Sequence, residues 1–327
     1  MKLANIPEIF EAFNRLKVLI IGDVMLDSYI FGSVNRISPE APVPVVNVNK
    51  RDVRLGGAGN VAINIKALGA TPYLCSVVGD DTDSDVLLKL LTDNELPTDG
   101  IIKSEGRMTT VKQRILAGSQ HVIRIDSEID SPINTQEEVL LVQKAEELAK
   151  ICDVIIFEDY DKGVLTSASI QAIVKWAKEN GVPTIVDPKK RNFLHYAGVD
   201  IFKPNLKELR EGLQMKISTD NIEDLNKSVS LAKEKLGVGG LLLTLSEKGV
   251  YIDFKEEKHH IDAHIRQIAD VSGAGDTVVS IAAACLAMGL SPKQIAEISN
   301  LGGGLVCEHI GVVPIDKKQL LAEAMKI

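Results

Sequence analysis

The sequence predicts an α/β fold in which a mostly parallel sheet carries helices on both faces, with a small β-strand lid beside it. Three observations lead to this prediction. Short apolar runs alternate with amphipathic stretches along most of the 327 residues. The runs are rich in Val and Ile, which is typical of strands buried on both faces of a parallel sheet. Residues 28–52 and 104–126 break this alternation and are typical of antiparallel or edge strands.

The expected elements follow in chain order. IPEIFEAFNRLK spaces its apolar residues like an amphipathic helix, and KVLIIGDVML, residues 17–26, is the first predicted strand. Outside the lid segments, helices are predicted at 59–69, 135–151, 167–181 and from Leu206 onward, and strands at 72–79, 152–159, 183–188, in VDIFKPN and in GLLLTLSEKGVYID.

Repeated strand–helix–strand units of this kind predict one parallel sheet covered by helices on both faces. The sequence shows no internal repeat and no low-complexity linker. We therefore expect a single domain over residues 1–327, into which the two lid segments are inserted.

Composition excludes several classes of partner. Hydrophobic residues make up 45% of the chain and charged residues 25%, as in ordinary globular proteins. The net charge of −8 argues against nucleic acid and against an anionic membrane as partners. Four cysteines without C-x-x-C spacing and no visible signal peptide favour a cytoplasmic location. The run KEEKHH, which contains His259 and His260, is predicted to be a solvated loop, with a metal site as the weaker interpretation.

Polar residues follow the predicted strands. In open parallel sheets, ligands bind beyond the carboxyl ends of the strands, so these residues are the candidates for a site. Each one alone is more typical of a turn or a helix cap. Together they are Asp23, Asp27, Glu158, Asp159, Asp187, Lys189, Asn205, Glu208, Thr244, Ser246, Asp270 and Asp276.

The stretch DVSGAGDT, residues 270–277, adds a chemical prediction. Gly273 and Gly275 allow successive N–H groups to converge on an anion at the start of the following apolar helix. Asp276 in the first turn of that helix could accept a proton from a hydroxyl that attacks a bound phosphoryl group. The alternative is a glycine turn followed by an ordinary first-turn aspartate.

A second glycine-rich stretch, RLGGAGN, places Gly56, Gly57, Gly59 and Asn60 before a predicted helix. Glycines there let the backbone approach a ligand closely, and an amide can both donate to and accept from hydroxyls. The spacing is not the G-x-G-x-x-G of a dinucleotide site and does not follow the first strand, and the chain has no P-loop lysine motif.

LGGAGN near the start, NLKE in the middle and DVSGAGDT late together resemble the ribokinase-like (PfkB) carbohydrate kinases over essentially the whole chain. DVMLDSYIFGSVNRISPEAPVPVV, DYDKGVLT, IVDPKK and KPNLKEL are similar to one branch, the D-glycero-β-D-manno-heptose-7-phosphate kinases. Members of this branch are often fused to a nucleotidyltransferase domain. This chain has no sequence for one, so the resemblance implies a stand-alone kinase with a ribokinase-like three-layer α/β/α fold.

The resemblance implies roles for the residues that match its motifs. Asp276 would be the general base, and Gly273 with the N–H groups of Ala274, Gly275 and Asp276 would form the anion hole. Asn205 and Glu208 match an N-x-x-E motif that holds Mg²⁺ near the phosphates. Taken alone, this pair fits an N-terminal capping box equally well.

Other matches concern the two substrates. Sugar hydroxyls would be held by Asp23, Asp27, Gly56, Gly57 and Asn60, with Asp27 equally typical of a cap at the lid hinge. Cations for a sugar phosphate would come from Arg114, Arg124, Lys162, Lys112 and Arg36, each of which alone is more typical of a solvated surface. The nucleotide would be bound by Lys189, Asn205, Thr244, Ser246, Gly249, Asp270, Gly273, Gly275 and, at adenine, Asn300. The three glycines at 302–304, where relatives tend to have alanine, predict a weakened helix beside the adenine pocket.

The resemblance thus implies transfer of phosphate from ATP, with Mg²⁺, to the 1-hydroxyl of the heptose 7-phosphate, giving the 1,7-bisphosphate. A requirement for a monovalent cation stays open, and a homodimer that pairs through the lid strands is expected. One alternative is a related kinase for fructose 1-phosphate or ribose. Another is a nucleotide- or sugar-binding regulator without catalysis, and a dehydrogenase is weaker again.

Overall fold

The computed structural model describes residues 5–118, 120–219, 221–264 and 266–326. Ser119, within the second predicted lid segment, lies outside the described residues, as do both ends of the predicted 1–327 domain. No helix in the described part of the chain is long and apolar enough to cross a membrane.

The main sheet has nine strands in the order β13-β12-β11-β10-β9-β8-β1-β4-β5. Neighbouring strands from β11 to β5 pair in parallel, and β12 and β13 add an antiparallel edge. The strands are β1 Lys17–Gly22, β4 Thr71–Gly79, β5 Ile101–Ser104, β8 Val154–Glu158, β9 Thr184–Asp187, β10 Ile201–Phe202, β11 Gly240–Thr244, β12 Val250–Phe254 and β13 Glu257–Ile261.

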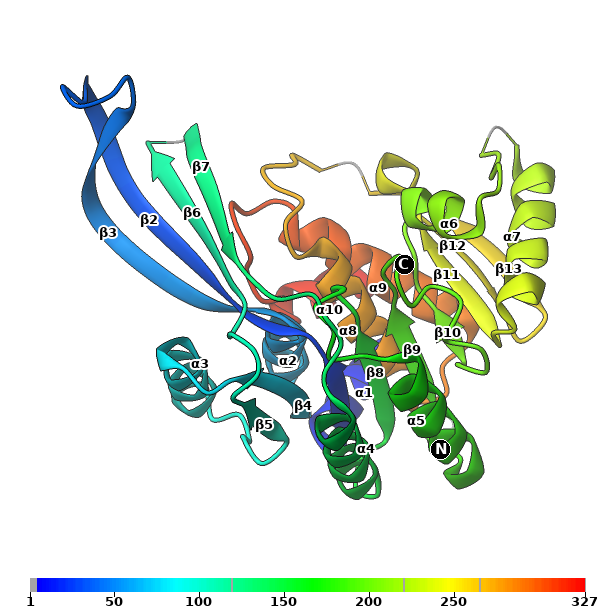
Figure 1. Cartoon of the computed structure of the whole chain (residues 1–327). Coiled ribbons are helices and arrows are strands. Elements are labelled where there is room, and N and C mark those ends of the chain that lie inside the picture. Colours follow the sequence, from blue (N-terminus) through cyan, green and yellow to red (C-terminus); the bar gives the residue numbers. More distant parts are fainter. Residues whose placement is uncertain (1–4, 119, 220, 265, 327) are drawn as a thin grey trace.

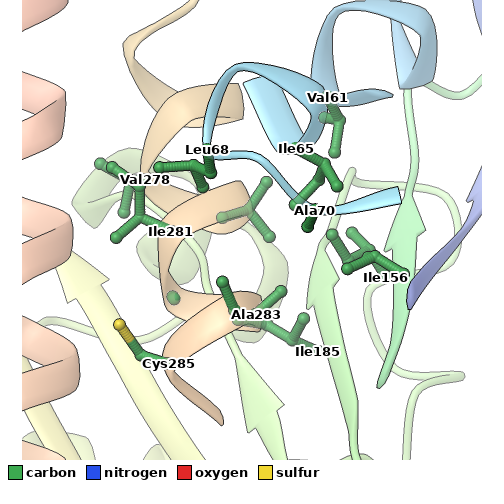
Figure 2. Packing of buried hydrophobic residues seen from close by; sticks show 14 of the residues in the cluster. Val61, Ile65, Leu68, Ala70, Ile156, Ile185, Val278, Ile281, Ala283 and Cys285 are labelled. Carbon is green, nitrogen blue, oxygen red and sulfur yellow. The ribbon is translucent and has the colours of Figure 1, made fainter. Parts of the chain in front are cut away.

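Helices cover both faces of this sheet, so the predicted three-layer α/β/α fold is confirmed (Figure 1). One core cluster includes side chains of the first group of helices, which are α1 Ile6–Ala12, α2 Ala58–Ala67, α3 Thr82–Asp93, α8 Ala274–Ala287, α9 Pro292–Val306 and α10 Lys317–Ala324. The other includes side chains of α4 Thr135–Ala149, α5 Ser167–Asn180, α6 Leu206–Leu213 and α7 Ile222–Leu236. Figure 2 shows part of the first cluster, where Ile65 of α2 and Ala283 of α8 lie over Ile156 and Ile185 of the sheet.

The predicted lid is a second, four-stranded sheet in the order β3-β2-β6-β7. Its strands project away from the main sheet (Figure 1). The outer pairs β2–β3 and β6–β7 are antiparallel, whereas β2 and β6 run parallel. The strands are β2 Val24–Ile37, β3 Pro44–Gly57, β6 Val111–Ala117 and β7 Gln120–Ser127. The first pair extends beyond the predicted segment 28–52 at both ends, whereas the second pair begins seven residues later than the predicted segment 104–126 and ends one residue after it.

Two predictions of secondary structure were wrong. Residues 17–26 are not one strand, because β1 ends at Gly22 and the chain turns at Asp23 into β2 of the lid. Both halves are apolar, so the sequence pattern does not show that they belong to different sheets. His259 and His260 lie in β13 rather than in a loop, since their backbone pairs with Ile252 and Tyr251 of β12. The ring of His259 contacts Glu257, and that of His260 contacts the carbonyl of Lys248.

The three glycines at 302–304 do not interrupt the helix, because α9 continues through all of them to Val306. They allow α9 to approach its neighbours closely. A Cβ at Gly302 would lie 2.0 Å from Cδ1 of Ile281, and one at Gly303 would lie 2.7 Å from Cγ2 of Val278, both on α8. Close packing of α8 against α9 thus compensates for the low helix propensity of glycine.

We expect Gly302→Ala to destabilise the protein even though alanine favours a helix. Overpacking costs about 1–3 kcal/mol and the gain in propensity returns about 1 kcal/mol, so the net loss is about 1 kcal/mol. Ile281→Val removes the clashing Cδ1 and alone costs about 0.5–1.5 kcal/mol. Urea unfolding of the double variant should show a smaller loss than the sum of the two single variants. Strictly additive losses would contradict this account of the packing.

Candidate active site

The N-terminus of α8 opens the candidate site. Gly273 is its N-cap residue with φ of 79°, a conformation that glycine adopts without strain, and no side chain caps the helix. The N–H of Ala274 donates to the carbonyl of Val271 at 3.3 Å. No backbone acceptor among the described residues takes the N–H of Gly275 or Asp276. Two of the three N–H groups predicted for the anion hole are therefore available, together with the positive end of the helix dipole.

Asp276 is buried in the first turn of α8, and both of its carboxylate oxygens are hydrogen-bonded. Asn60 Nδ2 donates to Oδ2 at 2.6 Å, and the hydroxyl of Tyr160 donates to Oδ1 at 2.8 Å. Burial raises the pKa of Asp276 to about 6, opposed by the bond from Asn60 and increased by the charge of Asp187. The structure thus brings Asn60, from the early glycine-rich stretch, into direct contact with Asp276, from the late one.

Two more buried acids lie beside Asp276. One carboxylate oxygen from each of Glu158, Asp187 and Asp276 falls within 4.8 Å of the other two. Lys203 Nζ forms an ion pair with Asp187 at 2.9 Å, and both side chains are almost fully buried. Neither oxygen of Glu158 has a hydrogen-bond partner among the described residues. Burial, followed by the charges of Asp187 and Asp276, raises the pKa of Glu158 well above its usual value, which favours its neutral form.

The carboxylate of Asp23 binds a neighbouring loop in this structure. It accepts hydrogen bonds from the backbone N–H groups of Tyr160, Lys162 and Val164 at 2.8–3.1 Å. Burial raises the pKa of Asp23, and these three bonds oppose the rise. Asp23 therefore holds the loop that carries Tyr160. Its predicted contact with a sugar hydroxyl stays a prediction.

Asp27, Gly56 and Gly57 lie where the lid joins the main body. Asp27 on β2 is buried and forms an ion pair with Arg114 on β6. Gly56 and Gly57 end β3, and Gly57 is the N-cap of α2 with φ of 57°. A Cβ at Gly56 would lie 2.3 Å from Oδ2 of Asp27, so this glycine leaves room for the carboxylate. Because α2 begins directly after β3, Asp27 and Asn60 lie in the same region.

The predicted phosphate-binding cations lie on the lid or next to it, and most of them are paired. Besides Arg114, Arg124 binds Asp126 at 2.5 Å and Lys162 binds Glu128 at 2.7 Å. Lys112 on β6 is partly buried and has no ion-pair partner among the described residues. Burial lowers the pKa of Lys112, and the charge of Lys162 lowers it further. Its Nζ lies 5.1 Å from the centre of the Tyr160 ring.

Asn205 and Glu208 form the capping box that the sequence left open as an alternative. Asn205 Oδ1 accepts from the N–H of Glu208, and Glu208 Oε2 accepts from the N–H of Asn205, both at 2.8 Å. Glu208 Oε1 lies 2.7 Å from Lys189 Nζ. Burial lowers the pKa of Lys189, but the charges of Asp187 and Glu208 outweigh burial and raise it above its usual value. The metal role of this pair stays a prediction.

A pocket of about 580 Å³ opens beside the N-terminus of α8. This volume suits a ligand as large as a nucleotide. Five predicted nucleotide-binding residues line it: Thr244, Ser246, Gly249, Gly275 and Asn300. Ala274, Gly303, Gly304 and Arg266 also line it, so the close approach of α9 shapes its wall.

The remaining predicted nucleotide-binding residues, Lys189, Asn205, Asp270 and Gly273, do not line this pocket. Asp270 binds its own loop, since it accepts from the N–H and hydroxyl of Ser272 and from the N–H of Gly311 at 2.9–3.0 Å. A ligand contact for Asp270 stays a prediction.

Three residues of the site were not predicted as site residues. Tyr160 and Lys203 come from loops that follow β8 and β10, where DYDKG and FKPN are polar strand ends of the kind that the sequence points to. Glu158 was noted at a strand end but had no predicted role. Arg266 reaches the pocket wall from a long connection and pairs with Glu308 and Glu323. No local pattern distinguishes Arg266 from a surface arginine.

With this geometry described, the chain can be compared with known proteins. The family model described as "pfkB family carbohydrate kinase" matches residues 15–318. The chain belongs to this family. It is a carbohydrate kinase, and the predicted family is confirmed.

Curated relatives named "Bifunctional protein HldE" are similar over nearly the whole chain. The protein from Syntrophotalea carbinolica is 36% identical over 321 residues, which are 98% of this chain and 65% of that protein. The one from Geotalea uraniireducens is 36% identical over 325 residues, 99% of this chain and 66% of that protein. The chain therefore spans about 65% of the length of these relatives.

Solved structures share the fold. A ribokinase from Arabidopsis thaliana, complexed with ribose and ATP, has a TM-score of 0.74 at 18% identity and covers 96% of this chain and 99% of its own. Phosphofructokinase-2 from Escherichia coli, in complex with substrates and products, has a TM-score of 0.76 at 18% identity. The match covers 95% of this chain and 99% of the phosphofructokinase chain. The ribokinase-like fold is therefore confirmed.

Proposed function

We propose that the chain transfers the terminal phosphoryl group of ATP to the 1-hydroxyl of D-glycero-β-D-manno-heptose 7-phosphate. The observation that carries the proposal is the position of Asp276, which lies between free N–H groups at the start of α8 and Asn60 from the early glycine-rich stretch. An acceptor hydroxyl and a phosphoryl group can meet there. The choice of sugar comes from the motifs that resemble the heptose 7-phosphate kinases, and identity of about 36% to the HldE relatives supports it.

In this mechanism, Asp276 accepts the proton of the attacking hydroxyl. The new bond forms between the acceptor oxygen and phosphorus, while the bond from phosphorus to the ADP oxygen breaks. The N–H groups of Gly275 and Asp276 stabilise the negative charge on the migrating phosphoryl group. Asn60 fixes the carboxylate through Oδ2. A pKa of about 6 leaves Asp276 ionised at pH 7 and more basic than an ordinary aspartate.

We propose that the pocket of about 580 Å³ binds the nucleotide, with Asn300 and the glycines of α9 near the base. Lys189 and the N-terminus of α8 would face the phosphates. Mg²⁺ keeps much of its water shell, so the oxygens of Asn205 and Glu208 suit contacts through water even though both side chains are engaged in the capping box. The metal would supply charge neutralisation for the transferred group.

Lys112 is our candidate for the phosphate of the sugar. It lies on the lid face that carries Asp27 and Arg114, and its contact with the Tyr160 ring places it close to Asp276. Arg114, Arg124 and Lys162 already have carboxylate partners. An anion beside Lys112 would stabilise its charged form, which burial disfavours.

We further propose a homodimer that pairs through the lids. Side chains alternate between the two faces of a strand, so Ile30, Ile115 and Ile123 fall on the face opposite to Tyr29 and Arg114. On that outer face Val48, Ile123 and Ile125 are 43–51% exposed. Clustered exposed apolar residues on a sheet are typical of an interaction surface.

Asp276→Asn tests the proposed base. The amide cannot accept the proton, so turnover should fall by a factor of about 10²–10⁴ in a coupled ADP assay. Binding of ATP, measured by calorimetry, should stay close to that of the unchanged protein, because the volume of the side chain is preserved. Near-normal turnover would remove Asp276 from this role.

A panel of acceptors tests the proposed sugar. We expect the highest kcat/KM for the heptose 7-phosphate, ahead of fructose 1-phosphate, fructose and ribose. Lys112→Met should raise the KM for phosphorylated acceptors about 10- to 100-fold, since a hydrogen bond to a charged group contributes about 1.5–3 kcal/mol. The KM for unphosphorylated sugars should change much less than the KM for phosphorylated acceptors in Lys112→Met. A clear preference for ribose or fructose would refute the proposed substrate.

Light scattering tests the proposed dimer. The unchanged protein should have the mass of a dimer, and Ile123→Asp with Ile125→Asp should yield monomers because charges would be buried at the interface. Leu231→Asp is the matched control, because Leu231 on α7 is 54% exposed and lies outside the lid. A dimer that survives the lid substitutions would place the interface elsewhere.

A further inference from the structure

We propose that Tyr160 is a positioning residue for Asp276: its hydroxyl orients the carboxylate and favours its ionised form before the acceptor sugar binds. The proposal rests on the proposed role of Asp276 as the base. No motif of the sequence assigns a role to Tyr160. It follows from the hydrogen bond of 2.8 Å between the Tyr160 hydroxyl and Oδ1 of Asp276.

The structure holds Tyr160 from three directions. Its backbone N–H donates to Oδ2 of Asp23 at 2.8 Å, at the point where the chain leaves the main sheet for the lid. Lys112 of the lid lies 5.1 Å from the ring centre, and Lys189 lies 5.4 Å from it. Two cations near an aromatic ring make favourable contacts with its π-electrons. The ring is therefore positioned by Lys112 of the lid strand β6 and by Lys189, which also pairs with Glu208.

The same hydrogen bond sets which form of Asp276 is favoured. The titratable groups that face Asp276 are Glu158 from β8, Asp187 from β9 and Lys203 from the segment after β10, and the neutral amide of Asn60 comes from α2. The pKa of Tyr160 itself is raised well above its usual value by burial and by the charge of Asp276, so the phenol stays protonated and donates. Donation to an anion favours the ionised carboxylate.

Tyr160→Phe removes this donor and keeps the ring between the two lysines. We expect the acid limb of the pH profile of kcat/KM to move to higher pH by about one to two units, because loss of the donor disfavours the ionised form of Asp276. The profile of kcat/KM is the one to measure, since it reports groups of the free enzyme. At pH 6, kcat/KM should fall about tenfold or more, and the difference should shrink as the pH rises. The acceptor is the best sugar phosphate of the panel, so the experiment does not depend on which sugar is preferred.

Two comparisons make the result specific. Tyr251→Phe is the matched control, since its hydroxyl donates to Asn226 of α7 at 2.5 Å and its ring packs in the core cluster that does not include α8. The acid limb of this variant should not move. The phosphate of the substrate also titrates near pH 6, but it does so equally in every variant and cancels in the difference. An acid limb in Tyr160→Phe that coincides with that of the unchanged protein would overturn the proposal.

A second variant keeps the test decisive if Tyr160→Phe folds poorly. Site-specific 3-fluorotyrosine at position 160 keeps the shape and makes the hydroxyl a stronger donor, so the acid limb should move to lower pH. A limb that stays in place or moves upward would overturn the proposal. Failure of the role of Tyr160 can be told apart from failure of the proposed base. If Asp276→Asn keeps its turnover, Asp276 is not the base. If Asp276→Asn is inactive but the acid limb does not move in the Tyr160 variants, only the role of Tyr160 is refuted.

Discussion

The site depends on one constraint: a carboxylate that is removed from water must stay ionised beside other acids. Desolvation favours the protonated form of Asp276, and the negative charge of Asp187 adds to that tendency. Asn60 and Tyr160 oppose it by donating to opposite oxygens of the carboxylate. One donor comes from the helix that follows the lid and the other from the loop after β8, so the ionisation of Asp276 depends on how the lid and the main sheet are joined.

That junction lies at Asp23. The strand β1 is an interior strand of the main sheet between β8 and β4, and one residue after it ends the chain enters β2 of the lid. The carboxylate of Asp23 accepts three N–H groups from the loop that follows β8, so it connects the start of the lid to the loop of Tyr160. A buried carboxylate with three backbone donors is expensive to disrupt. Asp23 therefore makes the position of Tyr160 depend on the course of the lid strands.

The sequence predicted the main architecture because its signals are local. Buried parallel strands appear as Val- and Ile-rich runs, and helix ends appear as caps such as Thr166 and Gly181. Asp276 and Asn60 could be found because glycine-rich turns mark them. The split of residues 17–26 between two sheets could not be predicted, since both parts are equally apolar. The same holds for Tyr160, because its contact with Asp276 joins residues 116 positions apart.

Charge balance explains why this many acids can lie in a pocket that we expect to receive two anionic substrates. Asp187 is neutralised by Lys203 at 2.9 Å, and the raised pKa of Glu158 favours its neutral form. Glu208 is paired with Lys189, and Asp27 with Arg114. Among these five acids, Asp276 is left as the ionised carboxylate without a cationic partner within ion-pair distance, and its partners are the neutral donors Asn60 and Tyr160. Within this set, the carboxylate without a cationic partner is thus the group that has to accept a proton, and Lys112 of the lid lies over the ring of Tyr160, whose hydroxyl contacts that carboxylate.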